Sequence, residues 1–308
     1  MDLSVRLGRI AMRNPIATAS GCGGWGEELA RFYDLSCLGA VVTKSVTLRP
    51  RPGHPPPRLV EVRAGLLNAI GLANVGLERF LAEKLPALRT WDVPVIVNVA
   101  GSTPEEYTEV AAALDAAEGV AGIELNVSCP NVAHGGIEFG TDPKVLVRLV
   151  EAVRGKVARA TLIVKLSPNV TDIAATARAA AEAGADALSL INTLRGMAID
   201  PWTGRPALSN RTGGLSGPAV KPVAVYMVRR VWEEVAGPRG LPILGMGGVQ
   251  FPEDVVEFLR AGATAVAVGT ANFVSPTAAA DLVDGLEGAL RRLGVGRVAD
   301  LVGRVEER

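Results

Sequence analysis

The chain has 308 residues, and 48% of them are hydrophobic but only 4% aromatic, so aliphatic side chains must fill a large core. Lysine plus arginine and aspartate plus glutamate number 32 each, and no basic block stands out, which argues against a nucleic-acid-binding protein. Three cysteines without a Cys-x-x-Cys pair, and no apolar run of ~20 residues, argue against a disulfide framework, a metal site and a membrane span, so we expect a cytoplasmic protein.

Short apolar runs alternate with amphipathic stretches along the whole chain. The segment "VRLGRIAMRNP" predicts a small β-hairpin ahead of the first run, placed to cover the bottom of a barrel. Strands are predicted at 16–21, 40–45, 95–100, 122–128, 163–168, 187–192, 243–248 and 265–270. Helices are predicted between them at 104–119, 142–157, 172–185 and 252–263. Near-continuous apolar strands alternating with helices indicate a parallel sheet covered by helices.

Eight such strand–helix units are the number found in a closed (β/α)8 TIM barrel. A doubly wound sheet is the alternative, but it usually has fewer strands per domain. The first strand here ends in "ASGCGGWG", and the number of strands favours the barrel. We therefore expect residues 1–308 to form one barrel domain.

Three long inserts follow the second, fourth and sixth predicted strands, at residues 46–75, 129–141 and 193–217. They are rich in proline, glycine and asparagine and show little helical periodicity. Loops that follow the strands of a barrel build its active site. All three inserts are therefore expected on the active face.

Polar residues recur at the carboxyl ends of the predicted strands. The ring they form contains Ser20, Lys44, Ser45, Asn98, Asn126, Ser128, Lys165, Asn192, Thr193, Gly247, Gly248, Gly269 and Thr270. The chain has only six lysines, yet two of them lie in apolar strands, where an unpaired charge is costly. Ordinary strand-end hydrogen bonding explains each residue alone, whereas the joint placement favours a site for a polar, planar anion. Glu124, the acidic residue in the strands, is placed near the start of its strand and apart from this ring.

The segment "GMGGVQFPEDVVEFLRAGATAVAVGTA" at 245–271 predicts a phosphate site. Its glycines follow the seventh and eighth strands, where barrels commonly bind phosphate through backbone N–H groups. The alternative is that the glycines serve only tight strand–helix turns.

Several motifs together resemble class 1 dihydroorotate dehydrogenases. They are "NVSCPNVAHGG", "VKLSPNV", "LINTLRG", "GGLSGPA", "GMGGV" and "AVAVGTA", in this order. The segment "TKSVTLRPRPGHPPPRLVEVRAGLLNAIGL" is most similar to the class 1B catalytic subunit, although His54 stands where that family would have asparagine. The resemblance spans residues 3–292 and implies oxidation of dihydroorotate to orotate in pyrimidine synthesis.

The resemblance also implies which residues form the site. One FMN per chain would be held by Ser20, Lys44, Ser45, Asn98, Asn126, Lys165, Ile191, Gly217, Gly247, Gly248, Gly269 and Thr270. The substrate would be held by Lys44, Asn68, Ala69, Ile70, Gly71, Leu72, Asn126, Asn131, Asn192 and Thr193. Cys129 matches the catalytic base, and Lys165 would stabilise the reduced flavin.

The electron acceptor depends on the subclass that the chain belongs to. In class 1B, FAD and a [2Fe-2S] cluster lie on a partner subunit, and a homodimer of this chain would complete a heterotetramer. The alternatives are a fumarate-linked class 1A enzyme, or a related FMN barrel acting on another pyrimidine, such as the pyrimidine-reducing domain of dihydropyrimidine dehydrogenase. A non-enzymatic flavin- or phosphate-binding scaffold is the remaining one. The quinone-linked membrane class uses a serine base, which the Cys129 motif argues against.

Overall fold

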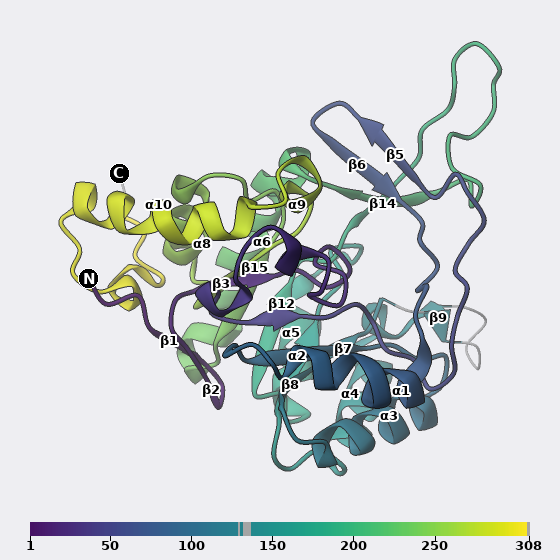
Figure 1. The fold of residues 1–308 in the computed structure, drawn as a ribbon, viewed down its shortest axis with the longest axis horizontal. Helices are drawn as coiled ribbons and strands as arrows, with labels where there is room; N and C mark the ends of the chain where they lie inside the picture. The colour runs from purple at the N-terminus through teal and green to yellow at the C-terminus, as the bar shows by residue number, and fades with distance from the viewer. Residues whose placement is uncertain (129, 132–136, 307–308) are drawn as a thin grey trace.

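The structure is a computed structural model that describes residues 1–128, 130, 131 and 137–306. Eight parallel strands form its central sheet (Figure 1). In chain order they are β3 (Ile16–Thr18), β4 (Val41–Val42), β7 (Val95–Val99), β8 (Val120–Asn126), β11 (Thr161–Lys165), β12 (Ala187–Leu190), β15 (Ile243–Met246) and β16 (Ala265–Val268). Each lies within a predicted run or overlaps it, so the eight predicted strands are confirmed.

The sheet closes between its first and second strands, which confirms the barrel and excludes a doubly wound sheet. The strand order is β3-β16-β15-β12-β11-β8-β7-β4, and a parallel bridge between Ala17 and Ala40 joins the two ends. The side chain of Thr18 completes this junction. Its hydroxyl donates to the carbonyl of Val42 at 3.1 Å and accepts from the N–H of Val42 at 2.8 Å.

Helices cover the outside of the barrel and bury an apolar stripe against the strands. The longer ones are α3 (Pro104–Ala116), α4 (Pro143–Arg154), α5 (Ile173–Glu182), α6 (Lys221–Val231), α8 (Pro252–Ala261) and α10 (Ala278–Leu293). The four predicted helices are confirmed as α3, α4, α5 and α8. Thr103, Asp142 and Asp172 cap the first turns of α3, α4 and α5 by accepting a backbone hydrogen bond, which fixes where these helices begin.

The remaining α-helices are short. They are α1 (Gly76–Arg79), α2 (Leu85–Leu88), α7 (Gly237–Arg239) and α9 (Ala271–Val274), with π-helical turns at Phe80–Lys84 and Trp232–Ala236. Among the helices of the described residues, none has the length and apolar character that a membrane span requires.

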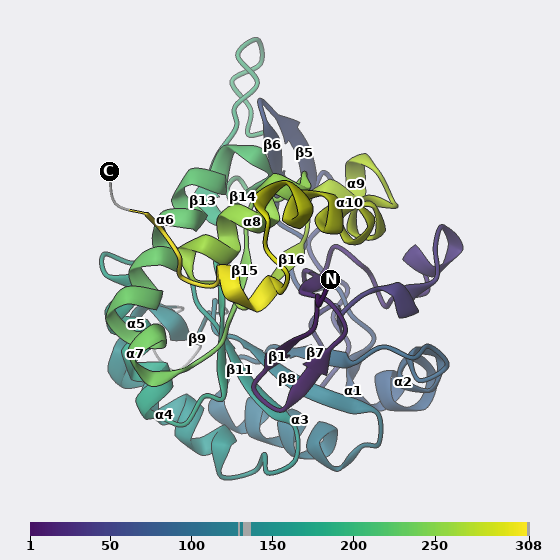
Figure 2. The same cartoon turned by 90° about the vertical axis from the view of Figure 1, so that its left-hand side faces the viewer.

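The N-terminal hairpin lies across the end of the barrel where the strands begin (Figure 2). It consists of β1 (Val5–Leu7) and β2 (Ile10–Met12), as predicted. Leu7 and Ile10 are buried, and the N–H of Arg9 donates to Thr161 at the start of β11. This end of the barrel is therefore sealed, and access is left to the opposite end.

The long inserts lie at the carboxyl end of the strands, on the side opposite the hairpin (Figure 1). Two of them combine into an antiparallel sheet that the sequence did not predict. Its order is β13 (Leu194–Gly196), β14 (Gly213–Ser216), β6 (Gly65–Asn68) and β5 (Leu59–Val62). The insert after β8 holds a smaller pair, β9 (Pro130–Asn131) and β10 (Ile137–Glu138).

Candidate active site

A cavity of about 440 Å³ opens at the carboxyl end of the barrel, between the strand ends and the insert sheet. A volume of this size suits a small-molecule ligand. The cavity brings together most of the residues that the sequence singled out. They are Ser20, Lys44, Ser45, Asn68, Ile70, Leu72, Asn126, Lys165, Ile191, Asn192, Thr193, Gly217, Gly247, Gly248, Gly269 and Thr270.

A few expected residues are placed elsewhere. Asn98 is fully buried beneath the cavity, and Ala69 and Gly71 belong to the segment at its edge without lining it. Cys129 lies outside the described residues, so its expected role as the base is not tested by the structure. The backbone of Asn131 forms part of β9, but its side chain is outside the description as well.

Part of the cavity lining was not predicted from the sequence. The additional residues are Ala19, Gly21, Cys22, Arg58, Leu59, Leu66, Ala73, Ser216, Pro218, Met246, Val249, Gln250, Ala267, Ala271 and Phe273. Several of them directly neighbour residues that were predicted, such as Ala19 beside Ser20, so they carried a positional signal. The positions of Leu59 and Leu66 depend on the insert sheet, for which the sequence gave no local indication.

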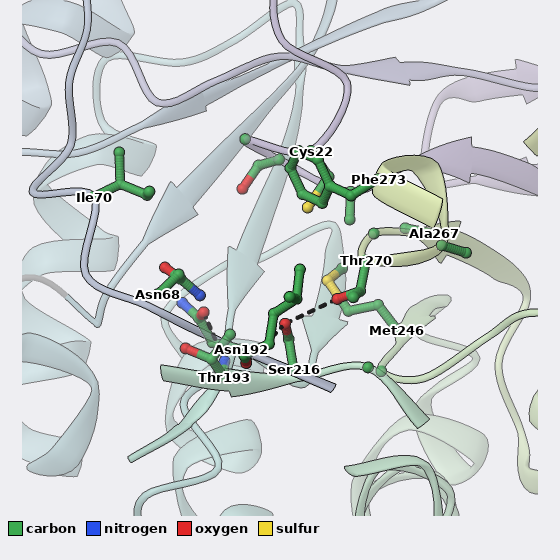
Figure 3. A pocket seen from close by; sticks show the side chains of 18 of the residues that line it. Cys22, Asn68, Ile70, Asn192, Thr193, Ser216, Met246, Ala267, Thr270 and Phe273 are labelled. Atoms are coloured by element: carbon green, nitrogen blue, oxygen red, sulfur yellow. Dashed lines mark hydrogen bonds between the residues drawn. The ribbon is translucent and has the colours of Figure 1, made fainter. Parts of the chain in front are cut away.

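Asparagine side chains gather at one end of the cavity, together with Thr193 (Figure 3). We call Asn68, Asn126 and Asn192 the amide cluster. Asn192 donates to the side-chain oxygen of Asn126 at 3.2 Å and to Ser128 at 2.9 Å. Asn68 donates to the carbonyl of Gly214 in the neighbouring strand β14, which fixes its orientation. These amides provide paired donors and acceptors that match the amide edges of a planar heterocycle.

The segment that carries Asn68 is held by contacts within its own insert. His54 Nδ1 lies 3.0 Å from the carbonyl of Ala69, and the N–H of His54 donates to the carbonyl of Ile70. The N–H of Ala69 donates to the backbone carbonyl of Arg58 at 2.8 Å. The histidine that departs from the family pattern therefore fastens the edge of the cavity.

Glycines line the other end of the cavity, at the ends of β15 and β16 and before a short turn at Pro218–Val220. We call Gly217, Gly247, Gly248 and Gly269 the glycine end. A Cβ on Gly248 would lie 2.8 Å from the carbonyl oxygen of Gly217, and the φ of Gly248 is +79°. Only glycine allows this close backbone approach. Ser216 at the end of β14 and Thr270 just after β16 are linked by a 2.8 Å hydrogen bond between their hydroxyls (Figure 3).

Two lysines line the cavity wall, each with a distinct neighbour. Lys165 Nζ donates to Ser20 at 3.1 Å and lies 3.8 Å from Oε1 of Glu124. Lys44 Nζ lies 5.9 Å from the centre of the Trp25 ring, within the range of a cation–π contact. The two lysines therefore bring ammonium groups to the cavity wall, which suits an anionic ligand.

Glu124 corrects one expectation from the sequence. It is the fifth of the seven residues of β8, and its side chain is fully buried inside the barrel, directly next to the polar ring. Side chains two residues apart in a strand point to the same face, and Asn126 lines the cavity. Glu124 therefore points inward as well and contacts the ring.

Cys22 is the described thiol of the cavity. Burial raises its pKa to about 11, and the nearby charge of Lys165 lowers it by a smaller amount. Its exposed surface lines the cavity, away from bulk water. The Cys22 thiol is therefore neutral near pH 7 and unsuited to act as a base.

Comparison with known proteins points to one family. The family model described as "Dihydroorotate dehydrogenase" matches residues 2–290. A protein from Pelobacter propionicus is 54% identical over 305 residues, which cover 99% of this chain and 99% of that protein. Proteins from Geobacillus kaustophilus and Geotalea daltonii are 54% and 53% identical, over 98% and 99% of this chain and 95% and 98% of their own lengths. All three are named "Dihydroorotate dehydrogenase B (NAD(+)), catalytic subunit".

Proposed function

The chain belongs to the dihydroorotate dehydrogenase family, and from this premise we propose its function. It oxidises dihydroorotate to orotate in pyrimidine biosynthesis, as the class 1B catalytic subunit of an enzyme that passes electrons to NAD. The observation that carries this proposal is the single cavity that joins the glycine end, the two lysines and the amide cluster. The NAD(+) in the relatives' names argues against the fumarate-linked alternative.

We propose FMN as the cofactor, one per chain. The glycine end is a cradle that a Cβ would fill, as Gly248 shows, and it suits a phosphate group. Lys165 is suited to contact the flavin ring of the cofactor, where a positive charge stabilises the negative charge of the reduced flavin. The residues proposed to hold FMN are Ser20, Lys44, Ser45, Asn126, Lys165, Ile191, Gly217, Gly247, Gly248, Gly269 and Thr270, with Asn98 supporting Ser45 from below.

The amide cluster and Lys44 are proposed to hold the substrate. The Lys44 ammonium matches the substrate carboxylate as a point charge, and the amides match the N–H and carbonyl groups of the pyrimidine ring. The full proposed set is Lys44, Asn68, Ala69, Ile70, Gly71, Leu72, Asn126, Asn131, Asn192 and Thr193. Within it, Ala69 and Gly71 act through the position of their segment, since they do not line the cavity.

The reaction requires a base and a hydride acceptor on opposite faces of the substrate. Bound FMN supplies the hydride acceptor. Cys129, as a thiolate, removes the proton from C5 while the hydride leaves C6, so the carbon–carbon double bond of orotate forms between these two atoms. Lys165 holds its positive charge at the cavity wall during this step.

A partner subunit is proposed to carry electrons onward. The chain has three cysteines, fewer than the four ligands of an iron–sulfur cluster. We therefore place the [2Fe-2S] cluster and FAD on the partner, in a heterotetramer built on a dimer of this chain. The relatives' name "catalytic subunit" supports a partner of this kind.

The test uses the purified chain with and without its partner. The chain alone should carry one FMN, and anaerobic dihydroorotate should bleach the flavin absorption. The reduced chain should then be reoxidised by NAD only when the iron–sulfur subunit is added. Reoxidation by fumarate without a partner would overturn the NAD-linked assignment, and a flavin that dihydroorotate does not reduce would overturn the substrate.

A further inference from the structure

A buried carboxylate lies directly beneath the cavity, and the reaction described above does not use it. The Glu124 side chain has no exposed surface, although a carboxylate is costly to bury without partners. In the strand register Glu124 pairs with Asn98 of β7 and with Ile163 of β11. Its position is therefore fixed by the barrel itself.

The neutral partners of Glu124 all donate hydrogen bonds to it. Asn98 Nδ2 donates to Oε1 at 2.6 Å, and Ser189 Oγ donates to Oε2 at 2.7 Å. Ser45 in turn donates to Oδ1 of Asn98, which orients that amide so that its NH2 group faces Glu124. The oriented Asn98 amide and the Ser189 hydroxyl give each carboxylate oxygen a hydrogen-bond donor, which suits an ionised carboxylate.

The positive partner of Glu124 is the lysine of the cavity wall. Lys165 Nζ lies 3.8 Å from Oε1 of Glu124, and only 6% of the Lys165 side chain is exposed. The same ammonium donates to Ser20 at the cavity surface. Lys165 therefore stands between a buried carboxylate and the space proposed for the flavin.

We propose that Glu124 is a positioning residue that keeps Lys165 charged and seated at the cavity wall, and thereby favours reduced over oxidised flavin. A lysine this deeply buried loses its proton readily when no counter-charge is near. A neutral amine gives the reduced flavin much less stabilisation than an ammonium does. This inference rests on the proposed flavin site.

The direction in which the flavin reduction potential shifts distinguishes this role from a purely structural one. If Lys165 stayed charged without Glu124, then removing the carboxylate would leave a net positive wall and raise the flavin reduction potential. If Glu124 keeps Lys165 charged, its removal lowers the potential. The two readings predict opposite shifts.

The test is the reduction potential of the purified flavin-bound protein with Glu124→Gln. The substitution preserves shape, because the Ser189 hydroxyl can rotate to accept from the new amide. We expect reduced flavin to bind about tenfold less favourably relative to oxidised flavin, a fall of about 30 mV for a two-electron couple. A potential that rises or does not change overturns the proposal.

Matched controls distinguish charge from packing. Ser189→Ala removes a hydrogen bond to Glu124 but keeps the carboxylate, so the potential should stay near that of the unmodified protein. In flavin-free protein, Lys165 of the Glu124→Gln variant should react faster with an amine-selective reagent at a fixed pH, because the neutral amine is the nucleophile. An unchanged labelling rate contradicts the proposal.

If Glu124→Gln does not fold, Glu124→Asp carries the test. The shorter side chain keeps the charge but moves it away from Lys165, so a smaller fall in potential is expected, and a rise overturns the proposal. Unmodified protein that binds no flavin would refute the proposed function itself, which is a different result.

Discussion

The ion pair beneath the cavity predicts a large and specific loss of stability when Lys165 is replaced by methionine. The substitution keeps the length of the side chain but leaves the carboxylate of Glu124 buried without a counter-charge. At 3.8 Å and an effective dielectric constant of ~20, the lost attraction is about 4 kcal/mol. Breaking a buried pair on one side commonly costs about 3–5 kcal/mol, so we expect a loss in that range.

The double variant Lys165→Met with Glu124→Gln is the matched control. It has no buried charge at this position, so it should recover more than half of the lost stability. Urea unfolding of flavin-free protein at neutral pH measures both changes, with fluorescence and circular dichroism followed together to check that unfolding has one step. A double variant no more stable than Lys165→Met would refute the reasoning.

Three further predictions concern the barrel and the cavity. Thr18→Val should lower the free energy of unfolding by about 2–4 kcal/mol, because it removes the hydroxyl that bonds the buried N–H and carbonyl of Val42. Thr18→Ser keeps the hydroxyl and should lower this free energy by only about 1 kcal/mol. Equal losses for the two variants in urea unfolding would contradict the role of the hydroxyl. In flavin-free protein, Cys22 should resist iodoacetamide at pH 8 and react only as the pH approaches about 11, because burial raises the pKa of its thiol. Rapid labelling of Cys22 at pH 8, measured by mass spectrometry, would contradict this raised pKa. Burial alone would raise the pKa of Asp254, but hydrogen bonds from Lys221 and two backbone N–H groups outweigh burial and lower it. Asp254 therefore stabilises the fold when the pH is above 3.8, its unfolded pKa, and stabilises it less as the pH falls below that value. Asp254→Asn should lower the free energy of unfolding in urea by about 1–2 kcal/mol at pH 7 and by much less near pH 3, and an equal loss at both pH values would contradict this.

The barrel was predictable because its physical signals are local. Strands buried on both faces must be apolar along their length, as in β7 and β11, where every residue is buried. The glycine end was predictable for a related reason, since a residue such as Gly248 permits a backbone conformation that other residues rarely adopt. The residues at the carboxyl ends of these strands then followed from the barrel geometry.

The insert sheet was not predictable in the same way. Strands β6 and β14 pair Leu66 with Ser216, which are far apart in the chain, and no local pattern in either segment specifies this partner. The lining residues Leu59 and Leu66 depend on that pairing. They could be identified only from the structure.

The position of Glu124 was within reach of the sequence. It lies two residues before Asn126, and the alternation of side chains in a strand puts both on the inner face. What the sequence could not supply was the set of partners, because Asn98, Lys165 and Ser189 come from three other strands. The register between β7 and β8 also shifts between Val95 and Ile96, which a sequence pattern does not reveal.

The reduction of the bound flavin by dihydroorotate, followed anaerobically by stopped-flow absorbance, tests the central claim most directly. Unmodified protein should bleach within a single turnover, whereas Cys129→Ala should bind orotate with similar affinity and reduce its flavin at least about 100-fold more slowly, as the loss of a general base requires. Equal rates in the two proteins would contradict the assignment of Cys129, and no bleaching in the unmodified protein would contradict the proposed reaction.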